Sequence, residues 1–173
     1  MIIGLTGYMG SGKSSVGARL AARLGFEFID LDRYIEEKIG LSIAEIFELE
    51  GENYFRAIEA EALRDVVVMH QLCHKDLVLA LGGGTITIKG VRHLILEDML
   101  CIYLKADIST LKRRLENESE GRPLLKEEGE MERLFQERRK LYESVPYSLC
   151  TDGKSLEEVE EELFGLIKKE VSK

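Results

Sequence analysis

A glycine-rich motif near the start of the chain limits the possible folds more than any other feature of the sequence. Residues 7–14 read Gly-Tyr-Met-Gly-Ser-Gly-Lys-Ser and fit the pattern G-x-x-x-x-G-K-[ST]. The short apolar run 2–6 precedes the motif, and Val16, Leu20 and Leu24 follow it at the spacing of one helix face. The motif requires that context, because its loop binds phosphate through backbone N–H groups at a helix N-terminus. The sequence therefore predicts a strand–loop–helix unit that binds a nucleoside triphosphate.

Two side chains of the motif have the chemistry that a bound nucleotide needs. Lys13 is predicted to bridge the β- and γ-phosphates, and the Ser14 hydroxyl is predicted to ligate Mg²⁺. The alternative interpretation is a glycine-rich turn followed by a coincidental Lys-Ser pair. The apolar run before the motif and the helical spacing after it favour the phosphate site.

Strand-like and helical runs alternate along the whole chain, which predicts an α/β fold with a parallel sheet. Ser42 with Glu45, and Ser155 with Glu158, have the spacing of capping boxes at helix starts. No repeat or linker interrupts the pattern, so we expect a single domain over 1–173. The expected strands are 2–6, 26–29, 77–81, 100–104 and 148–150. The expected helical segments are one that ends before Gly25, one from 33 to about 68 with breaks near Gly40 and Gly51, then 91–97, 107–114, 131–145 and one after Ser155.

Composition narrows the class of protein. The chain is 45% hydrophobic and 32% charged, which is enough apolar material for a core. It has no run of the roughly 18 apolar residues of a membrane-spanning helix, and its start lacks the basic region and cleavage site of a secretory signal. The net charge of −8 removes bulk attraction to DNA or RNA. Cys73, Cys101 and Cys150 lack the spacing of a disulfide framework. We expect a cytoplasmic monomer with small-molecule ligands and no nucleic-acid or membrane partner.

A carboxylate that supports Mg²⁺ is expected at the end of a second strand in this class of nucleotide site. The third expected strand ends in Gly82-Gly83-Gly84 rather than in an aspartate. Asp30 and Asp32, which follow the second strand, are the natural substitutes. Alternation along an extended segment would point both side chains the same way, so that one supports the metal and the other faces an acceptor hydroxyl. The alternative is that both only cap the following helix.

Three arginines stand out on this acidic chain, because phosphoryl transfer needs cations near the developing charge. Arg122 lies in the polar, charged segment 116–130, where a mobile lid could bring it onto the phosphates. Arg56 has Glu59 three residues further on, at the spacing that would hold its guanidinium in place. The planar fork of a guanidinium suits a carboxylate on the acceptor. Any single arginine, Arg138 included, is more often a solvated surface charge. A functional role for these arginines therefore depends on the pattern of motifs around them rather than on any one residue.

Taken together, these motifs resemble the shikimate kinase family, small kinases of the aromatic amino-acid pathway, over nearly the whole chain. Each of the six motifs except the first is only weakly specific for the family when taken alone. All six together, in this order along the chain, are specific for it. The pieces are the loop 7–14, Asp30-Leu31-Asp32, the segment 51–56 (Gly-Glu-Asn-Tyr-Phe-Arg), Gly82-Gly83-Gly84, the segment 121–125 (Gly-Arg-Pro-Leu-Leu) and the segment 138–142 (Arg-Arg-Lys-Leu-Tyr).

The resemblance implies a P-loop kinase fold with a five-stranded parallel sheet in the order 2-3-1-4-5. It implies a substrate-binding helical insertion at about 31–60, a lid at about 112–130, and transfer of the ATP γ-phosphoryl group to the 3-hydroxyl of shikimate. Lys13, Asp32 and Arg122 would then be the catalytic residues. The further residues implied are Gly10, Ser11, Gly12, Ser14, Ser15, Arg122 and Lys154 for ATP, Ser14 and Asp30 (through water) for Mg²⁺, and Asp32, Arg56, Gly82, Gly83 and Arg138 for shikimate; Arg113 or Arg114 would flank adenine.

The sequence departs from the family pattern at two places, and two other functions are still compatible with its motifs. Pro146 stands where a helix-compatible residue is expected, which would end the helix of Arg138 early, and the lid segment is unusually rich in glutamate. A gluconate or nucleoside-monophosphate kinase would share the phosphate loop and the lid. A regulatory module that senses ATP would share only the loop and needs no acceptor site.

Overall fold

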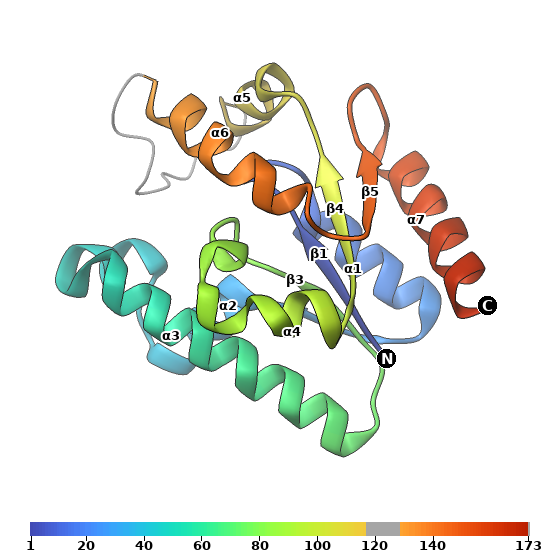
Figure 1. The fold of residues 1–173 in the computed structure, drawn as a ribbon, viewed down its shortest axis with the longest axis horizontal. Coiled ribbons are helices and arrows are strands. Elements are labelled where there is room, and N and C mark those ends of the chain that lie inside the picture. Colours follow the sequence, from blue (N-terminus) through green and yellow to red (C-terminus); the bar gives the residue numbers. More distant parts are fainter. Residues whose placement is uncertain (117–128, 173) are drawn as a thin grey trace.

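The chain forms a parallel five-stranded sheet with helices on both faces (Figure 1). The computed structural model describes residues 1–116 and 129–172. The strand order is β2-β3-β1-β4-β5, which confirms the expected order 2-3-1-4-5. The strands are β1 (Ile2–Thr6), β2 (Glu27–Asp30), β3 (Leu77–Ala80), β4 (Leu100–Lys105) and β5 (Tyr147–Cys150).

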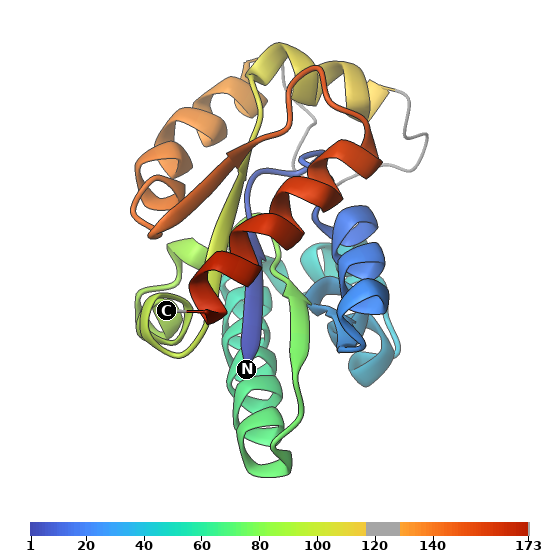
Figure 2. The same ribbon diagram turned by 90° about the vertical axis from the view of Figure 1, so that its right-hand side faces the viewer.

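Each face of the sheet packs against its own set of helices. Helices α1 (Lys13–Leu24) and α7 (Leu156–Val171) cover one face, where Ile3 and Leu5 of β1 are fully buried. Figure 2 shows α7 in front of the sheet and α3 behind it. The other face is covered by α3 (Ile43–Cys73), α4 (Arg92–Glu97) and α6 (Glu130–Tyr142). The continuous apolar runs of β1 and β3 follow from burial on both faces.

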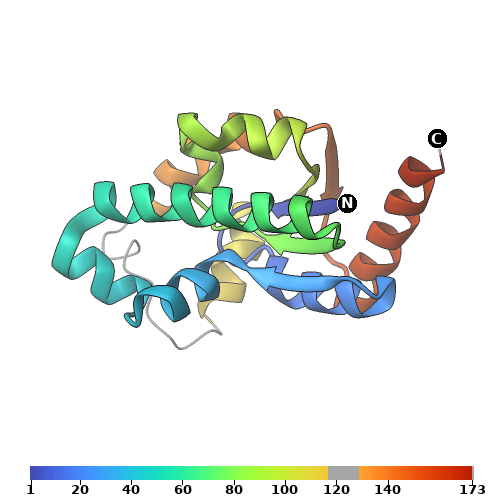
Figure 3. The same cartoon turned by 90° about the horizontal axis from the view of Figure 1, so that it is seen from below.

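Helices α2 (Leu31–Ile39) and α3 form the segment between β2 and β3. The capping box of Ser42 and Glu45 starts α3 as the sequence predicts. Gly51 interrupts α3 with a φ of 83°, a backbone angle that glycine adopts without strain, and Figure 3 shows the bend. Helix α2 begins two residues earlier than expected, at Leu31, because the Asp30 side chain accepts from the first free N–H groups of the helix.

Short elements complete the connections. The 3₁₀ turns η1 (Thr85–Thr87) and η2 (Lys89–Val91) lead from the triple glycine into α4. Helix α5 (Ile108–Glu116) and α6 flank residues 117–128, so Arg122 and the central part of the expected lid lie outside the described residues; the first lid residues, 112–116, belong to α5. Helix α6 ends at Tyr142, earlier than the expected 145; the backbone N–H groups of Ser144 and Val145 then donate to the carbonyl oxygens of Leu141 and Tyr142, three residues before each.

Two expectations from composition can be compared with the structure. Across residues 1–116 and 129–172, every helix is too short or too polar to cross a bilayer. Cys73, Cys101 and Cys150 all carry free thiols, as their spacing predicts. Burial raises the pKa of the Cys101 thiol to about 12, so this buried cysteine stays protonated.

Candidate active site

A polar cavity of about 680 Å³ lies where β1, β2 and β3 end. In an open α/β sheet this edge is the usual place for a ligand, because loops from neighbouring strands converge there. Side chains from α3 and α6 close its other sides. Of the residues that the sequence assigns to substrates and metal, the cavity is lined by Gly10, Gly12, Lys13, Ser14, Ser15, Asp30, Asp32, Arg56, Gly82, Gly83 and Arg138.

The loop after β1 forms the phosphate side of the cavity. Its glycines let the chain turn tightly, and α1 begins at Lys13, so the free N–H groups of its first turn face the cavity. The Lys13 ammonium is buried and donates to the carbonyl oxygens of Gly7 at 2.8 Å and Tyr8 at 3.0 Å. Ser11 is buried beside Lys13 rather than on the cavity wall, with its hydroxyl oxygen 3.4 Å from the ammonium.

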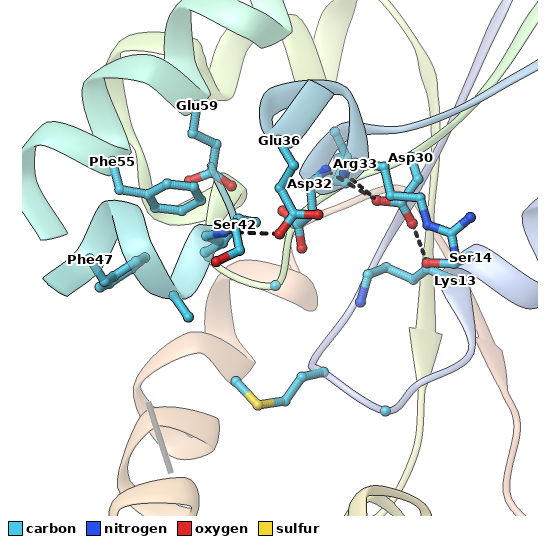
Figure 4. A pocket seen from close by; sticks show the side chains of 18 of the residues that line it. Lys13, Ser14, Asp30, Asp32, Arg33, Glu36, Ser42, Phe47, Phe55 and Glu59 are labelled. Atoms are coloured by element: carbon cyan, nitrogen blue, oxygen red, sulfur yellow. Dashed lines mark hydrogen bonds between the residues drawn. The ribbon is translucent and has the colours of Figure 1, made fainter. Parts of the chain in front are cut away.

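Ser14 and Asp30 meet at one side of this loop (Figure 4). The Ser14 hydroxyl donates a hydrogen bond to the Asp30 carboxylate. The other Asp30 oxygen accepts from the backbone N–H groups of Asp32 and Arg33 at 3.1 and 3.3 Å. The same carboxylate therefore caps α2 and contacts Ser14; the support of Mg²⁺ by Asp30 stays a prediction. A hydroxyl next to a carboxylate is a hard oxygen donor set, which fits Mg²⁺.

Asp32 reaches the cavity for a different reason than the sequence pattern suggested. The predicted alternation assumed an extended segment, but Asp32 lies in the first turn of α2. Its carboxylate nevertheless lines the cavity next to Asp30 and Glu36 (Figure 4). A Cβ on Gly82 would lie 2.8 Å from Asp32 Oδ1 and 2.5 Å from Glu59 Oε1, so only glycine lets the loop after β3 approach both carboxylates.

Arg56 is held on the opposite wall by a buried carboxylate, which confirms the predicted pairing. Its guanidinium donates to Glu59 Oε2 at 2.5 Å and to Glu52 Oε1 at 3.2 Å. Glu59 is fully buried and also accepts from the Thr85 hydroxyl. Burial by itself would lower the pKa of Arg56, but the charges of Glu59 and Glu52 outweigh it and raise that pKa above its ordinary value. Arg56 is thus a fixed cation on the cavity wall.

Arg138 reaches the cavity from α6 despite the early end of that helix. Its side chain is buried, and the guanidinium carbon lies 5.9 Å from the centre of the Tyr8 ring. A Cβ on Gly83 would lie 3.9 Å from the nearer guanidinium nitrogen. Pro146 follows four residues after the last helical residue, Tyr142, and Arg138 still lines the cavity.

Other predicted residues lie elsewhere. Lys154, on the loop between β5 and α7, pairs with Glu162 at 2.6 Å and does not line the cavity. Arg114 donates to the carbonyl oxygens of Gly10 at 3.3 Å and Thr151 at 3.0 Å, which links α5 to the phosphate loop. Of the two arginines left open by the sequence, Arg114 therefore has a contact that suits a nucleotide site; its role toward adenine stays a prediction.

Sequence reasoning did not assign roles to several residues of the site. Thr85 and Tyr142 contact predicted residues, while Glu36 shares a face of α2 with Asp32 at the i,i+4 spacing. The same i,i+4 spacing joins Arg138 and Tyr142 on α6. This spacing from a predicted site residue is the sequence signal that could have identified Glu36 and Tyr142. The cavity wall also includes Met9, Ser42, Ile43, Ala44, Phe47 and Phe55.

The family model and the relatives described next share one description. The family model described as shikimate kinase matches residues 9–168. A shikimate kinase of Dictyoglomus turgidum is 39% identical over 166 residues, which cover 94% of this chain and 94% of the relative. A shikimate kinase of Geobacter metallireducens is 42% identical, with 94% of this chain and 89% of the relative covered.

Similarity extends to the fold of a solved relative. The shikimate kinase of Acinetobacter baumannii in complex with shikimate superposes with a TM-score of 0.88 and 35% sequence identity. The match covers 98% of this chain and 93% of that one.

Proposed function

The chain belongs to the shikimate kinase family, and on that premise we propose that it transfers the γ-phosphoryl group of ATP to the 3-hydroxyl of shikimate. The products are shikimate 3-phosphate and ADP, in a step of aromatic amino-acid biosynthesis. The observation that carries this function is the division of one cavity into two walls. Lys13, Ser14 and Asp30 form a phosphate wall, and Arg56 and Arg138 form a wall suited to a carboxylate.

On the phosphate wall, backbone N–H groups from Gly10 to Ser15 and the Lys13 ammonium bind the ATP phosphates. Ser14 would ligate Mg²⁺ and Asp30 would support it through water; when bound, the ion would supply positive charge toward the transferred phosphoryl group. The contact of the Ser14 hydroxyl with the Asp30 carboxylate supports this assignment, because it already brings the two oxygen donors together. Lys13 exchanges its bonds to the loop carbonyls for bonds to phosphate.

On the acceptor wall, Arg56 and Arg138 bind the shikimate carboxylate with charge-assisted hydrogen bonds. Glu59 fixes Arg56 before the acceptor arrives, so little side-chain freedom is lost on binding. Asp32 contacts the acceptor hydroxyls and accepts the proton of the attacking one. Because the transition state is loose, the larger part of its contribution is orientation of that hydroxyl.

The remaining assignments extend the same proposal beyond the described contacts. Arg122 stabilises charge on the transferred phosphoryl group, and Lys154 contributes to the nucleotide side. We also propose that the enzyme acts in the cytoplasm as a monomer, on small molecules rather than on nucleic acid or at a membrane. The net charge of −8 supports the absence of a nucleic-acid partner.

The deciding experiment measures ADP release with Mg²⁺ and ATP, with and without shikimate, and beside quinate, gluconate and AMP. We expect strong stimulation by shikimate alone. Stimulation by gluconate or AMP instead would keep the phosphate wall and overturn the roles of Arg56 and Arg138. ATP binding without acceptor-dependent turnover would identify a nucleotide sensor.

A further inference from the structure

Tyr142 connects two parts of the acceptor wall that come from different elements. It is the last residue of α6 and is fully buried, with its ring stacked on Tyr103 at 5.1 Å and an interplanar angle of 20°. Its hydroxyl donates to the carbonyl oxygen of Gly83, and the positive charge of Arg138 acts on the same phenol. The phenol therefore lies between the triple glycine after β3 and an arginine one turn earlier on its own helix.

The chemistry of these groups fixes the direction of the hydrogen bond. A carbonyl oxygen only accepts, so the single phenol proton of Tyr142 is donated to Gly83. Burial raises the pKa of Tyr142 far above its ordinary value, so this proton is retained throughout the physiological pH range. The hydrogen bond from Tyr142 to Gly83 thus has one arrangement.

Gly83 is also the point where the two walls of the cavity approach each other. A Cβ on Gly83 would lie 3.5 Å from the backbone nitrogen of Met9, 3.8 Å from the Gly7 carbonyl oxygen and 3.9 Å from an Arg138 guanidinium nitrogen. A small displacement of Gly83 would therefore change the distance between the phosphate loop and the arginine. The Tyr142 hydroxyl holds Gly83 in that place through the Gly83 carbonyl oxygen.

We propose that Tyr142 is a positioning residue for acceptor binding: its hydroxyl fixes the place of Gly83 and, with it, the spacing between Gly83 and the Arg138 guanidinium. The proposal rests on the proposed function, since it requires Arg138 to bind the carboxylate of the acceptor. Tyr142 itself does not line the cavity, so it acts on shikimate through these two neighbours.

The test compares Tyr142→Phe with Tyr103→Phe. Each variant removes one phenol hydroxyl from the same stacked pair and keeps both rings. For Tyr142→Phe we expect the KM for shikimate to rise about tenfold, equivalent to about 1.4 kcal/mol, with the KM for ATP changed less than about twofold. For Tyr103→Phe we expect both constants to stay within about twofold of wild type. Equal effects of the two variants on the KM for shikimate would overturn the proposal, because loss of packing alone predicts that result.

A double-mutant cycle asks whether Tyr142 acts through Arg138. In an Arg138→Ala background, Tyr142→Phe should raise the KM for shikimate no further than about twofold, because the residue it positions is gone. A full additional tenfold rise would overturn the proposal. If Arg138→Ala leaves the KM for shikimate unchanged, the carboxylate role in the proposed function fails as well. If Arg138→Ala raises that KM and Tyr142→Phe does not, only the positioning role fails.

Folding of the variants is checked before the kinetics. The unfolding temperature is measured for each, and all assays run at a temperature where every variant remains folded. A Tyr142→Phe protein that is less stable than Tyr103→Phe but has a wild-type KM for shikimate would count against the proposal, since it assigns the hydroxyl to the fold alone.

Discussion

The Arg56 guanidinium and the Glu59 carboxylate lie 2.5 Å apart, and Glu59 has no exposed surface. A carboxylate without access to water is tolerated because Arg56 and the Thr85 hydroxyl both donate to it. Removal of one partner of such a pair leaves the other charge buried and uncompensated. The pair therefore links acceptor binding to the stability of α3, and its variants should affect both.

Arg56→Ala is expected to raise the KM for shikimate by about 10- to 100-fold while changing the KM for ATP little, because the carboxylate contact already exists in the ground state. It should also lower the unfolding temperature, since Glu59 loses its main donor. Arg64→Ala is the matched control: Arg64 lies on the same helix, is exposed and does not line the cavity. Steady-state kinetics with each substrate varied in turn decide the outcome. An unchanged KM for shikimate would contradict the role of Arg56.

Gly84→Ala tests the same wall without removing a charge. A Cβ at this position would lie 2.4 Å from both terminal nitrogens of Arg56, so the guanidinium must move. The φ of Gly84 is −101°, which alanine adopts without backbone strain. We expect a raised KM for shikimate in a protein that still folds. Gly165→Ala, whose Cβ would meet nothing within 4 Å, is the control for a new methyl group. Equal KM values for shikimate in the two variants would mean that Arg56 can move away from the new methyl group without loss of acceptor binding.

Asp32→Asn separates the acceptor role from the metal role. The amide keeps the shape of the side chain but loses its charge, so kcat should fall by about 10²- to 10⁴-fold, the range for a positioned acid or base. The dissociation constant for ATP with Mg²⁺, measured by calorimetry, should change little. Collapse of ATP affinity with normal acceptor kinetics would reassign Asp32 to the metal. Asp30→Asn is the informative companion, because Asp30 contacts Ser14 and should show the opposite pattern.

The strands and the main helices could be predicted because each depends on a local signal, whereas the strand order was implied by the family resemblance. Apolar runs mark β1 and β3, and the Ser42 capping box marks the start of α3. The start of α2 was misplaced because Asp30 reads equally well as the end of a strand and as an N-cap. That ambiguity also gave the wrong geometric reason for placing Asp32 beside it.

Contacts across the site were harder to predict than the residues that make them. Arg56 and Glu59 could be paired because three residues separate them on one helix. The bond from Tyr142 to Gly83 joins residues 59 positions apart, and it depends on how α6 packs over the sheet. Sequence spacing within one element carries no such information, so the role of Tyr142 emerges only from the fold.

Glu27 at the start of β2 provides a pH-dependent contribution to stability. Hydrogen bonds from Lys75, at 2.6 Å, and from His70, at 2.9 Å, lower the pKa of the Glu27 carboxyl. A folded-state pKa below the unfolded one stabilises the protein above the unfolded value, and this is lost as the pH falls through the folded value. Glu27→Gln should therefore lower the unfolding temperature at pH 7, and the difference from wild type should shrink as the pH falls below about 4.5.

The control for this titration is Glu37→Gln, which removes an exposed carboxylate from α2. Its unfolding temperature should follow the wild type at every pH. A difference between Glu27→Gln and wild type that persists unchanged at acidic pH would mean that the side chain contributes through packing rather than through its charge.

The three buried tyrosines around the acceptor wall also give the protein an optical property. The chain has no tryptophan and six tyrosines, so its intrinsic near-ultraviolet emission comes from tyrosine alone. Tyr8 faces the Arg138 guanidinium, Tyr142 bonds to Gly83 and Tyr103 stacks on Tyr142. A ligand that draws Arg138 toward its carboxylate changes the charge beside two of these rings. Titration of the unlabelled enzyme with acceptor can therefore be followed by its own fluorescence, with no reporter group introduced near the site.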